Sequence, residues 1–219
     1  MRLLLFILCL FVGTSVQAHD ARIQVIGDST FAWNGGLMAL RLQSALGTEV
    51  DDNSISGARV TAAGFLTRLL RADVQGQADP AGRDWIVMTG GANDLGSECG
   101  CTACATTLED LISADARRGE IMDIIRKARS AGARVIYAIY YDAPRGGGPF
   151  SACTPAFNEL ATRITRAANQ TDGLFVVDMG DVMNPDNPKD YDSDRVHPGP
   201  QASARIAELI AATIRAAER

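Results

Sequence analysis

Early in the sequence stands the stretch Arg22-Ile23-Gln24-Val25-Ile26-Gly27-Asp28-Ser29-Thr30. Its first part, Arg22–Gly27, is a short apolar run, which predicts a buried β-strand. Ser29 follows directly where this strand ends. The carboxyl ends of the strands in an α/β sheet border the crevice in which ligands bind. We therefore expect the Ser29 hydroxyl to face such a crevice.

Four further runs are short, apolar and bounded by Gly, Asp or Asn, so they also predict buried strands. They are Val50–Ile55, Asp84–Thr89, Arg134–Tyr141 and Leu174–Met179. Between the strands, apolar side chains recur at helical spacing. The predicted helices cover Leu37–Leu46, Val60–Leu70, Ile121–Ala131, Thr154–Ala168 and about Pro200–Ala217. We expect Thr154 to cap its helix, with Pro155 at the first helical position.

Strands that alternate with helices predict parallel pairing through right-handed crossovers. The predicted fold is a three-layer α/β/α sandwich with a five-stranded parallel sheet, similar to flavodoxin. In this arrangement the third and fourth strands are neighbours, and the polar residues that follow the strands share one rim of the sheet.

A second polar motif, Asp194-Arg195-Val196-His197-Pro198, lies just before the last predicted helix. A serine hydroxyl becomes a strong nucleophile when a histidine takes its proton, and a carboxylate orients that histidine. We therefore expect Ser29 to be the nucleophile, His197 the base and Asp194 its partner. His19 is the only other histidine, and Asp192 is a rival to Asp194.

Two glycine-containing segments supply candidates for an oxyanion hole. Gly57 ends the second strand region, and Asn93 follows the third strand. Attack on an ester carbonyl places negative charge on its oxygen, and preorganised N–H donors stabilise that charge. We expect donors from the backbone of Gly57, the side chain of Asn93 and the backbone of Ser29. Asp28 and Asp94 are interpreted as structural residues that accept hydrogen bonds.

These four segments resemble the sequence blocks of the SGNH, or GDSL-type, hydrolase family. The similar segments are Ile26–Ser29, Ser54–Gly57, Gly91–Asp94 and Asp194–Pro198. The resemblance implies the same roles for Ser29, Gly57, Asn93, Asp194 and His197, and it is strongest to a branch of small secreted arylesterases, thioesterases and lysophospholipases. The segment Thr30–Trp33 and a cysteine-rich insert at Glu98–Thr107 depart from that branch.

The first 18 residues have the features of a secretory signal peptide. Arg2 precedes the apolar run Leu3–Val12, and small residues follow as far as Ala18. This pattern predicts cleavage after Ala18, with an uncleaved anchor as the alternative. The apolar run is short for a membrane span. We therefore expect a secreted or periplasmic protein with one hydrolase domain at residues 19–219.

The remaining cysteines are even in number. They are Cys99, Cys101, Cys104 and Cys153. Export into an oxidising compartment favours two disulfides over a metal site. We expect Cys153 to bridge to the Cys99–Cys104 cluster, because the loops after the third and fourth strands are neighbours, and so to close a loop of roughly fifty residues.

The sequence predicts an esterase that acts on carboxylic esters or thioesters through an acyl-enzyme on Ser29. A polysaccharide or cell-wall O-acetyl esterase, an acyltransferase, and a catalytically silent carbohydrate- or lipid-binding protein are the alternatives. We expect a monomer with no cofactor and no metal, whose substrate is a small-molecule, lipid or glycan ester. The formal net charge of −5 argues against nucleic-acid binding.

Two other enzyme architectures are disfavoured by the sequence. Ser29 lacks the Gly-x-Ser-x-Gly setting of an α/β-hydrolase nucleophile, and no glycine-rich dinucleotide motif follows the first strand. The aromatic residues Tyr140, Tyr141, Phe150 and Trp33 are candidates to line an acyl pocket, with core packing as the alternative.

Overall fold

The computed structural model describes residues 22–61, 64 and 72–219. The predicted signal peptide, residues 1–18, lies outside this part of the chain. Most of the predicted helix Val60–Leu70 lies outside it as well, and residues 60 and 61 form a bend. No helix in the described ranges is both long and apolar enough to cross a membrane.

The sheet has five strands in the order β2-β1-β3-β4-β5, and every neighbouring pair is parallel. The strands are β1 Ile23–Ile26, β2 Val50–Asp52, β3 Trp85–Met88, β4 Arg134–Ile139 and β5 Leu174–Asp178. They lie within the five predicted runs and are shorter than those runs at one or both ends. The predicted fold class is confirmed, including the pairing of the third and fourth strands.

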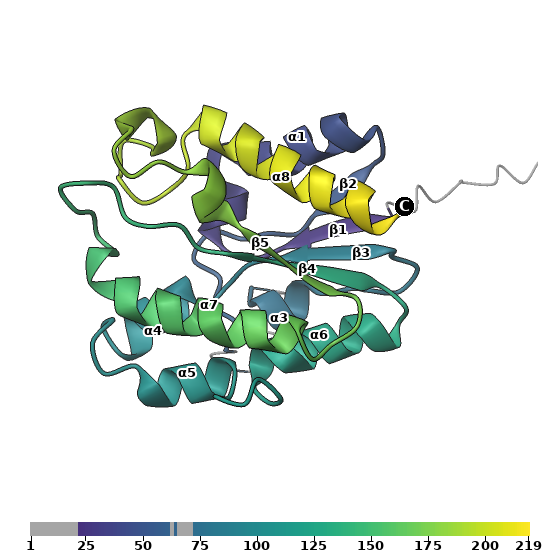
Figure 1. Cartoon of the computed structure of the whole chain (residues 1–219), viewed down its shortest axis with the longest axis horizontal. Coiled ribbons are helices and arrows are strands. Elements are labelled where there is room, and N and C mark those ends of the chain that lie inside the picture. Colours follow the sequence, from purple (N-terminus) through teal and green to yellow (C-terminus); the bar gives the residue numbers. More distant parts are fainter. Residues whose placement is uncertain (1–21, 62–63, 65–71) are drawn as a thin grey trace, which may run out of the picture.

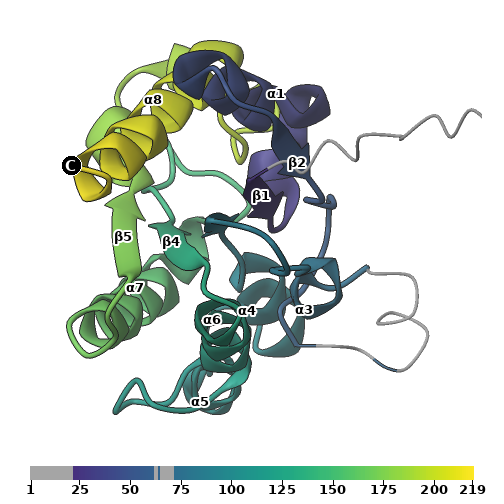
Figure 2. The same cartoon turned by 90° about the vertical axis from the view of Figure 1, so that its right-hand side faces the viewer.

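Helices cover both faces of the sheet, so the molecule has three layers (Figure 1). They are α1 Ser29–Leu46, α3 Val74–Gln77, α4 Ala92–Glu98, α5 Ala105–Leu111, α6 Glu120–Ser130, α7 Thr154–Ala168 and α8 Pro200–Ala217. Helices α1 and α8 pack on one face, and α3 to α7 lie on the other (Figure 2). Short 3₁₀ turns occupy residues 151–153, 179–182 and 188–190.

Two apolar clusters, one on each side of the sheet, form the core. Every residue of β3 is buried, and so is every residue of β4 after Arg134. Strands buried on both faces need apolar residues at consecutive positions, which explains their unbroken hydrophobic runs. Ile206, Ile210 and Ile214 of α8 are buried in one cluster, at the positions predicted from their spacing.

Helix α1 is interrupted near its start. Trp33, Asn34, Gly35 and Gly36 have non-helical backbone angles, with φ between 54° and 72° from Asn34 to Gly36. Asn and Gly tolerate this left-handed region better than other residues. The regular part of the helix therefore begins at residue 37, where the sequence predicted a helix to start.

The start of α7 differs from the prediction. Thr154 is the first residue of the helix, Cys153 occupies the capping position, and no side chain caps the helix. The Thr154 hydroxyl instead donates a hydrogen bond to the Ser151 carbonyl, 3.1 Å away. That carbonyl belongs to the preceding 3₁₀ turn, so the hydroxyl bonds to a residue three positions earlier and does not cap the new helix.

Two disulfides hold the cysteine-rich insert, which comprises the end of α4, a loop and the start of α5. Cys99 pairs with Cys104, and Cys101 pairs with Cys153. The second bridge has the long-loop arrangement expected from the sequence, because it spans 52 residues and joins the loops that follow β3 and β4.

The two disulfides should contribute unequally to stability. In the chain-entropy model the Cys101–Cys153 bridge stabilises by about 4 kcal/mol and the Cys99–Cys104 bridge by about 2 kcal/mol, because they close loops of 52 and 5 residues. We predict that C101A/C153A lowers the free energy of unfolding more than the matched control C99A/C104A. Urea denaturation at fixed pH measures both values, and an equal or reversed order would contradict the prediction.

Candidate active site

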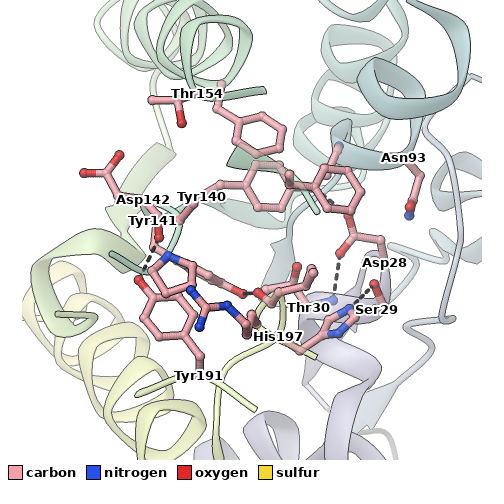
Figure 3. A pocket seen from close by; sticks show the side chains of 17 residues that line it. Asp28, Ser29, Thr30, Asn93, Tyr140, Tyr141, Asp142, Thr154, Tyr191 and His197 are labelled. Carbon is pink, nitrogen blue, oxygen red and sulfur yellow. Dashed lines mark hydrogen bonds between the residues drawn. The ribbon is translucent and has the colours of Figure 1, made fainter. Parts of the chain in front are cut away.

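The predicted site residues meet beyond the carboxyl ends of the strands. Figure 3 shows Ser29 beside His197, with Asn93 on a neighbouring segment. Ser29 is the first residue of α1, Asn93 lies in the first turn of α4, and His197 precedes α8. These residues line one pocket together. The fold thus brings together residues that are up to 168 positions apart.

Ser29, His197 and Asp194 form one run of hydrogen bonds. The Ser29 Oγ lies 2.7 Å from His197 Nε2. On the other side of the ring, His197 Nδ1 lies 2.5 Å from Asp194 Oδ2. A carboxylate at one ring nitrogen fixes the tautomer that leaves the other nitrogen free to accept a proton from serine. The geometry is that of a nucleophile, a base and the group that orients the base.

Asp194 is held as a carboxylate by its own turn. Its Oδ1 accepts hydrogen bonds from the backbone N–H groups of Val196 and His197, at 2.9 and 3.1 Å. Partial burial raises the pKa of Asp194, but the hydrogen bonds from the His197 side chain and from these N–H groups outweigh it, so its pKa lies below the usual value. Asp194 is therefore ionised at neutral pH.

Asp192 does not occupy the position of Asp194. Its Oδ2 accepts a hydrogen bond from the indole Nε1 of Trp33 at 2.8 Å. The Trp33 ring stacks on the His197 ring, with centroids 3.8 Å apart and planes inclined by 11°. Trp33 is not among the residues that line the pocket, so its candidate role in lining an acyl pocket is not supported. No local pattern in the sequence indicates this stacking.

The candidate oxyanion residues do not all line the same pocket. Asn93 borders the pocket that contains Ser29, and its Nδ2 donates one hydrogen bond to the Ala58 carbonyl at 2.9 Å. Gly57 is exposed, has φ of 80°, and borders an adjoining groove together with Asn93. An amide nitrogen carries two hydrogens, so Asn93 keeps a second one for another acceptor.

Asp94 and Asp28 each accept hydrogen bonds, which fits the structural roles predicted for them. Asp94 accepts from the backbone N–H groups of Val60 and Thr61, at 3.0 and 2.8 Å, and so ties the start of α4 to the segment after Gly57. Asp28 accepts from the Thr30 N–H at 2.9 Å and caps α1. Both carboxyl groups are buried.

Tyr140 supports the turn that carries Ser29. Its hydroxyl donates to Asp28 Oδ2 at 2.5 Å and accepts from the Ala92 N–H at 3.1 Å. Burial holds the pKa of the Tyr140 hydroxyl well above its usual value, so the phenol remains protonated. Burial also raises the pKa of Asp28, and the hydrogen bonds from Tyr140 and Thr30 offset part of this rise.

Two tyrosines connect the loop after β4 to the loop that carries His197. The Tyr141 hydroxyl donates to the Val196 carbonyl, and the Tyr191 hydroxyl donates to the Asp142 carbonyl, each at 2.7 Å (Figure 3). Arg195 has φ of 59° and donates to the backbone carbonyls of Arg145 and Gly147. These contacts fix the His197 loop against the wall of the pocket.

Gln77 is a structural support that the sequence did not reveal. Its side-chain oxygen accepts from the Gly27 N–H at 2.7 Å, and its side-chain nitrogen donates to the Gly27 carbonyl at 3.1 Å. Gly27 has φ of 153°, and a Cβ there would lie 2.8 Å from a Thr89 methyl carbon. Gln77 is fully buried and supplies the acceptor for the Gly27 N–H, whereas the Gly27 carbonyl also accepts from the Ile55 N–H at 3.0 Å.

The pocket beside Ser29 is small and largely aromatic. Its cavity volume is about 50 Å³. Its aromatic walls are Tyr140, Tyr141, Phe150, Phe157, Tyr191 and His197. Three of the four aromatic residues proposed from the sequence are thus pocket residues. Phe150 and Asn93 also border the adjoining groove, which has a volume of about 650 Å³. No cluster of three metal-ligating side chains occurs in residues 22–61, 64 and 72–219.

The chain folds as an α/β sandwich, and Ser29, His197 and Asp194 are hydrogen-bonded to one another at one rim of its sheet. The model of the GDSL-like lipase/acylhydrolase family matches residues 25–205. The chain belongs to this family, whose members are also known as SGNH hydrolases. The match spans all four sequence blocks.

Solved structures with the same fold include a GDSL-like lipase from Bacteroides thetaiotaomicron and a carbohydrate acetylesterase from Sinorhizobium meliloti. The first has a TM-score of 0.62 and 18% identity, and the alignment covers 90% of this chain and 89% of that chain. The second has a TM-score of 0.55 and 15% identity, with coverage of 89% and 98%. No curated protein matches the chain by sequence.

Replacing Gln77 tests its support of the Ser29 turn. Q77L would leave the buried Gly27 N–H without a partner and would remove one of the two donors to the Gly27 carbonyl. We therefore predict a loss of about 1–3 kcal/mol in the free energy of unfolding. The matched control is Q75L on the same short helix, where the side chain is half-buried; its effect should stay within about 0.5 kcal/mol. Equal urea midpoints for the two variants would contradict the assigned role of Gln77.

Proposed function

We propose that this protein is an exported serine esterase that hydrolyses carboxylic esters or thioesters through an acyl-enzyme on Ser29. The observation that carries this proposal is the run of hydrogen bonds from Asp194 through His197 to Ser29. That run ends at a pocket wall, so a bound ester can reach the Ser29 oxygen. Membership of a family of ester hydrolases supports the same reaction.

In the proposed mechanism His197 Nε2 takes the proton of Ser29 as its Oγ attacks the ester carbonyl carbon. The tetrahedral intermediate then collapses, and the protonated His197 gives its proton to the leaving alcohol or thiol. Water, deprotonated by His197, attacks the acyl-enzyme, and a second collapse releases the acid and restores Ser29. Asp194 orients His197 in both halves and stabilises its positive charge.

The negative oxygen of each intermediate requires preorganised N–H donors. We assign this role to the Ser29 N–H at the start of α1, to Asn93 and to the Gly57 N–H. The bond from Asn93 to the Ala58 carbonyl fixes the amide while leaving its second hydrogen available. The Asp94 bonds to Val60 and Thr61 hold the chain after Gly57 against the helix of Asn93. Substrate attack needs no metal ion in this scheme.

Export rests on the pattern of residues 1–18 and on the cysteine pairing. The two disulfides use all four cysteines outside that segment. Disulfides persist in oxidising compartments, which include the periplasm and the cell exterior. A secreted or periplasmic location therefore fits both observations.

The small cavity favours short acyl groups, and so favours an O-acetyl esterase as the second candidate. A water needs roughly 10–15 Å³ of such volume, so a cavity of about 50 Å³ holds about three to five water-sized groups. An acetyl group fits this space, whereas a long acyl chain would need the aromatic walls to move. The larger adjoining groove could accept a bulky alcohol portion, such as a sugar.

Replacing Ser29 tests the reaction directly. We predict that S29A lowers kcat/KM for 4-nitrophenyl acetate by about 10³-fold or more, because the nucleophile is lost. The matched control S44A changes an exposed serine on the same helix and should leave the rate unchanged. A fluorophosphonate probe should label the wild type and S44A but not S29A. Full activity of folded S29A would refute the proposed function.

Acyl-chain preference tests the second candidate. We predict that kcat/KM for 4-nitrophenyl acetate exceeds that for the octanoate by about tenfold or more, because the longer chain exceeds the cavity. F150A removes an aromatic wall and should raise the ratio of octanoate to acetate activity. A wild-type preference for octanoate, or an unchanged ratio in F150A, would contradict the assignment of this cavity to the acyl group.

A further inference from the structure

The hydrogen bonds of His197 leave one motion of its ring poorly restrained. Asp194 and Ser29 contact the two ring nitrogens, Nδ1 and Nε2. Both contacts lie at the edge of the ring. The ring is also bonded to Cβ through Cγ, and rotation about this bond can still tilt the ring plane, because χ2 of histidine is a broad torsion and hydrogen bonds tolerate moderate changes of angle. Such a tilt would turn the Nε2 lone pair away from the serine hydroxyl.

Trp33 restrains this tilt from the face of the ring. The indole and the imidazole are nearly parallel, at an angle of 11°, with their centroids 3.8 Å apart. This separation is within the range over which an aromatic face attracts a cation. In the proposed mechanism the imidazole becomes an imidazolium, so the same contact would stabilise the charge that develops when Ser29 loses its proton.

Trp33 is itself held by the segment that carries His197. Its indole N–H donates to Asp192 at 2.8 Å, and the side chain of the next residue, Asn34, donates to the Pro198 carbonyl at 3.3 Å. The hydrogen bond from Trp33 is the main reason why the pKa of Asp192 lies below its usual value. Three contacts therefore join the short segment 33–34 to residues 192–198.

The backbone near Trp33 departs from a regular helix in order to make these contacts. The non-helical angles of α1 occupy Trp33 to Gly36, immediately after its first turn. Gly36 packs so closely on Asp52 that a Cβ would lie 2.5 Å from that carboxylate. Asn34 adopts a left-handed conformation that non-glycine residues rarely take. Strain of this kind persists where surrounding contacts enforce it.

We propose that Trp33 is a positioning residue, anchored by Asp192, that holds the His197 ring in its reactive orientation and stabilises its protonated form. The inference rests on the proposed function, in which His197 is the base. It adds to the Ser29–His197–Asp194 run a second acidic residue, which acts on His197 through an aromatic ring instead of through a direct hydrogen bond.

The first test compares substitutions that keep or remove the aromatic face. W33L should lower kcat for 4-nitrophenyl acetate by about 3- to 30-fold, while KM changes by less than about 2-fold, because the loss concerns the base and not substrate binding. W33F retains a ring to stack on His197 but loses the hydrogen bond to Asp192, so its loss of kcat should be clearly smaller than that of W33L and not absent. L40A, at an exposed position on the same helix, should be unchanged.

The second test concerns the anchor. D192N retains an oxygen that can accept the indole hydrogen bond, whereas D192A removes it. We expect D192N to keep more kcat than D192A, again with little change in KM. These variants also test the proposal if W33L does not fold, because they leave the indole in place. Thermal unfolding of each variant shows whether a rate is measured on folded protein.

The outcomes separate this proposal from the proposed function. Wild-type kcat in W33L, equal losses in W33L and W33F, or changes confined to KM would overturn the positioning role. Equal kcat in D192N and D192A would overturn the role of Asp192 as anchor. H197A provides the remaining comparison: if it retains activity, the proposed function itself is wrong. If H197A is inactive and W33L is normal, only the role of Trp33 is wrong.

Discussion

The hydrogen bond between Ser29 and His197 is the contact on which the structure of the site depends. It joins the start of α1 to the loop before α8, across 168 positions of sequence. The Ser29 hydroxyl is a weak nucleophile until a base takes its proton, so its proposed role depends on His197. The parallel sheet makes the contact, since β1 lies inside the sheet and α1 and α8 pack together on the same face. The other hydrogen bonds around the site hold the two segments that carry these side chains, and so keep the side chains within contact distance.

The supports act from different directions. Gln77 holds the backbone of Gly27, and Tyr140 holds Asp28, so the Ser29 turn is fixed from the side of α3 and β4. Tyr141 and Arg195 fix the other loop against the chain after β4. Buried polar contacts of this kind are costly when they are incomplete. Here they are paired, so they define one geometry of the nucleophile and its base.

The sequence was sufficient to predict the sheet and to predict that Ser29, Asn93 and His197 lie close together. Buried parallel strands require consecutive apolar residues, and polar residues that follow them must share one rim, so Ser29, Asn93 and His197 could be placed together. The choice between Asp194 and Asp192 came from the structure, in which Asp194 contacts His197 and Asp192 contacts Trp33. Such patterns involve residues close together in the sequence, so the sequence alone reveals them.

The remaining contacts depend on tertiary packing that no local pattern encodes. Gln77 lies in a four-residue helix with no apolar periodicity, and its partner is 50 residues away. The stacking of Trp33 on His197 occurs where α1 is interrupted, and the partners of residues 33 and 34 lie more than 150 positions away, at residues 192–198. The prediction that Thr154 caps α7 was wrong. Thr followed by Pro usually marks the start of a helix, but here the hydroxyl donates to the Ser151 carbonyl of the preceding 3₁₀ turn.

Trapping the acyl group on the enzyme shows directly whether Ser29 is the nucleophile. The protein is mixed with 4-nitrophenyl acetate, quenched in acid within the first turnovers, digested and examined by mass spectrometry. If Ser29 is the nucleophile, the peptide that contains it should carry a single acetyl group after a short reaction and none once the substrate is exhausted. Hydrolysis at the wild-type rate with no acetyl group on Ser29, or with the acetyl group on another residue, would contradict it.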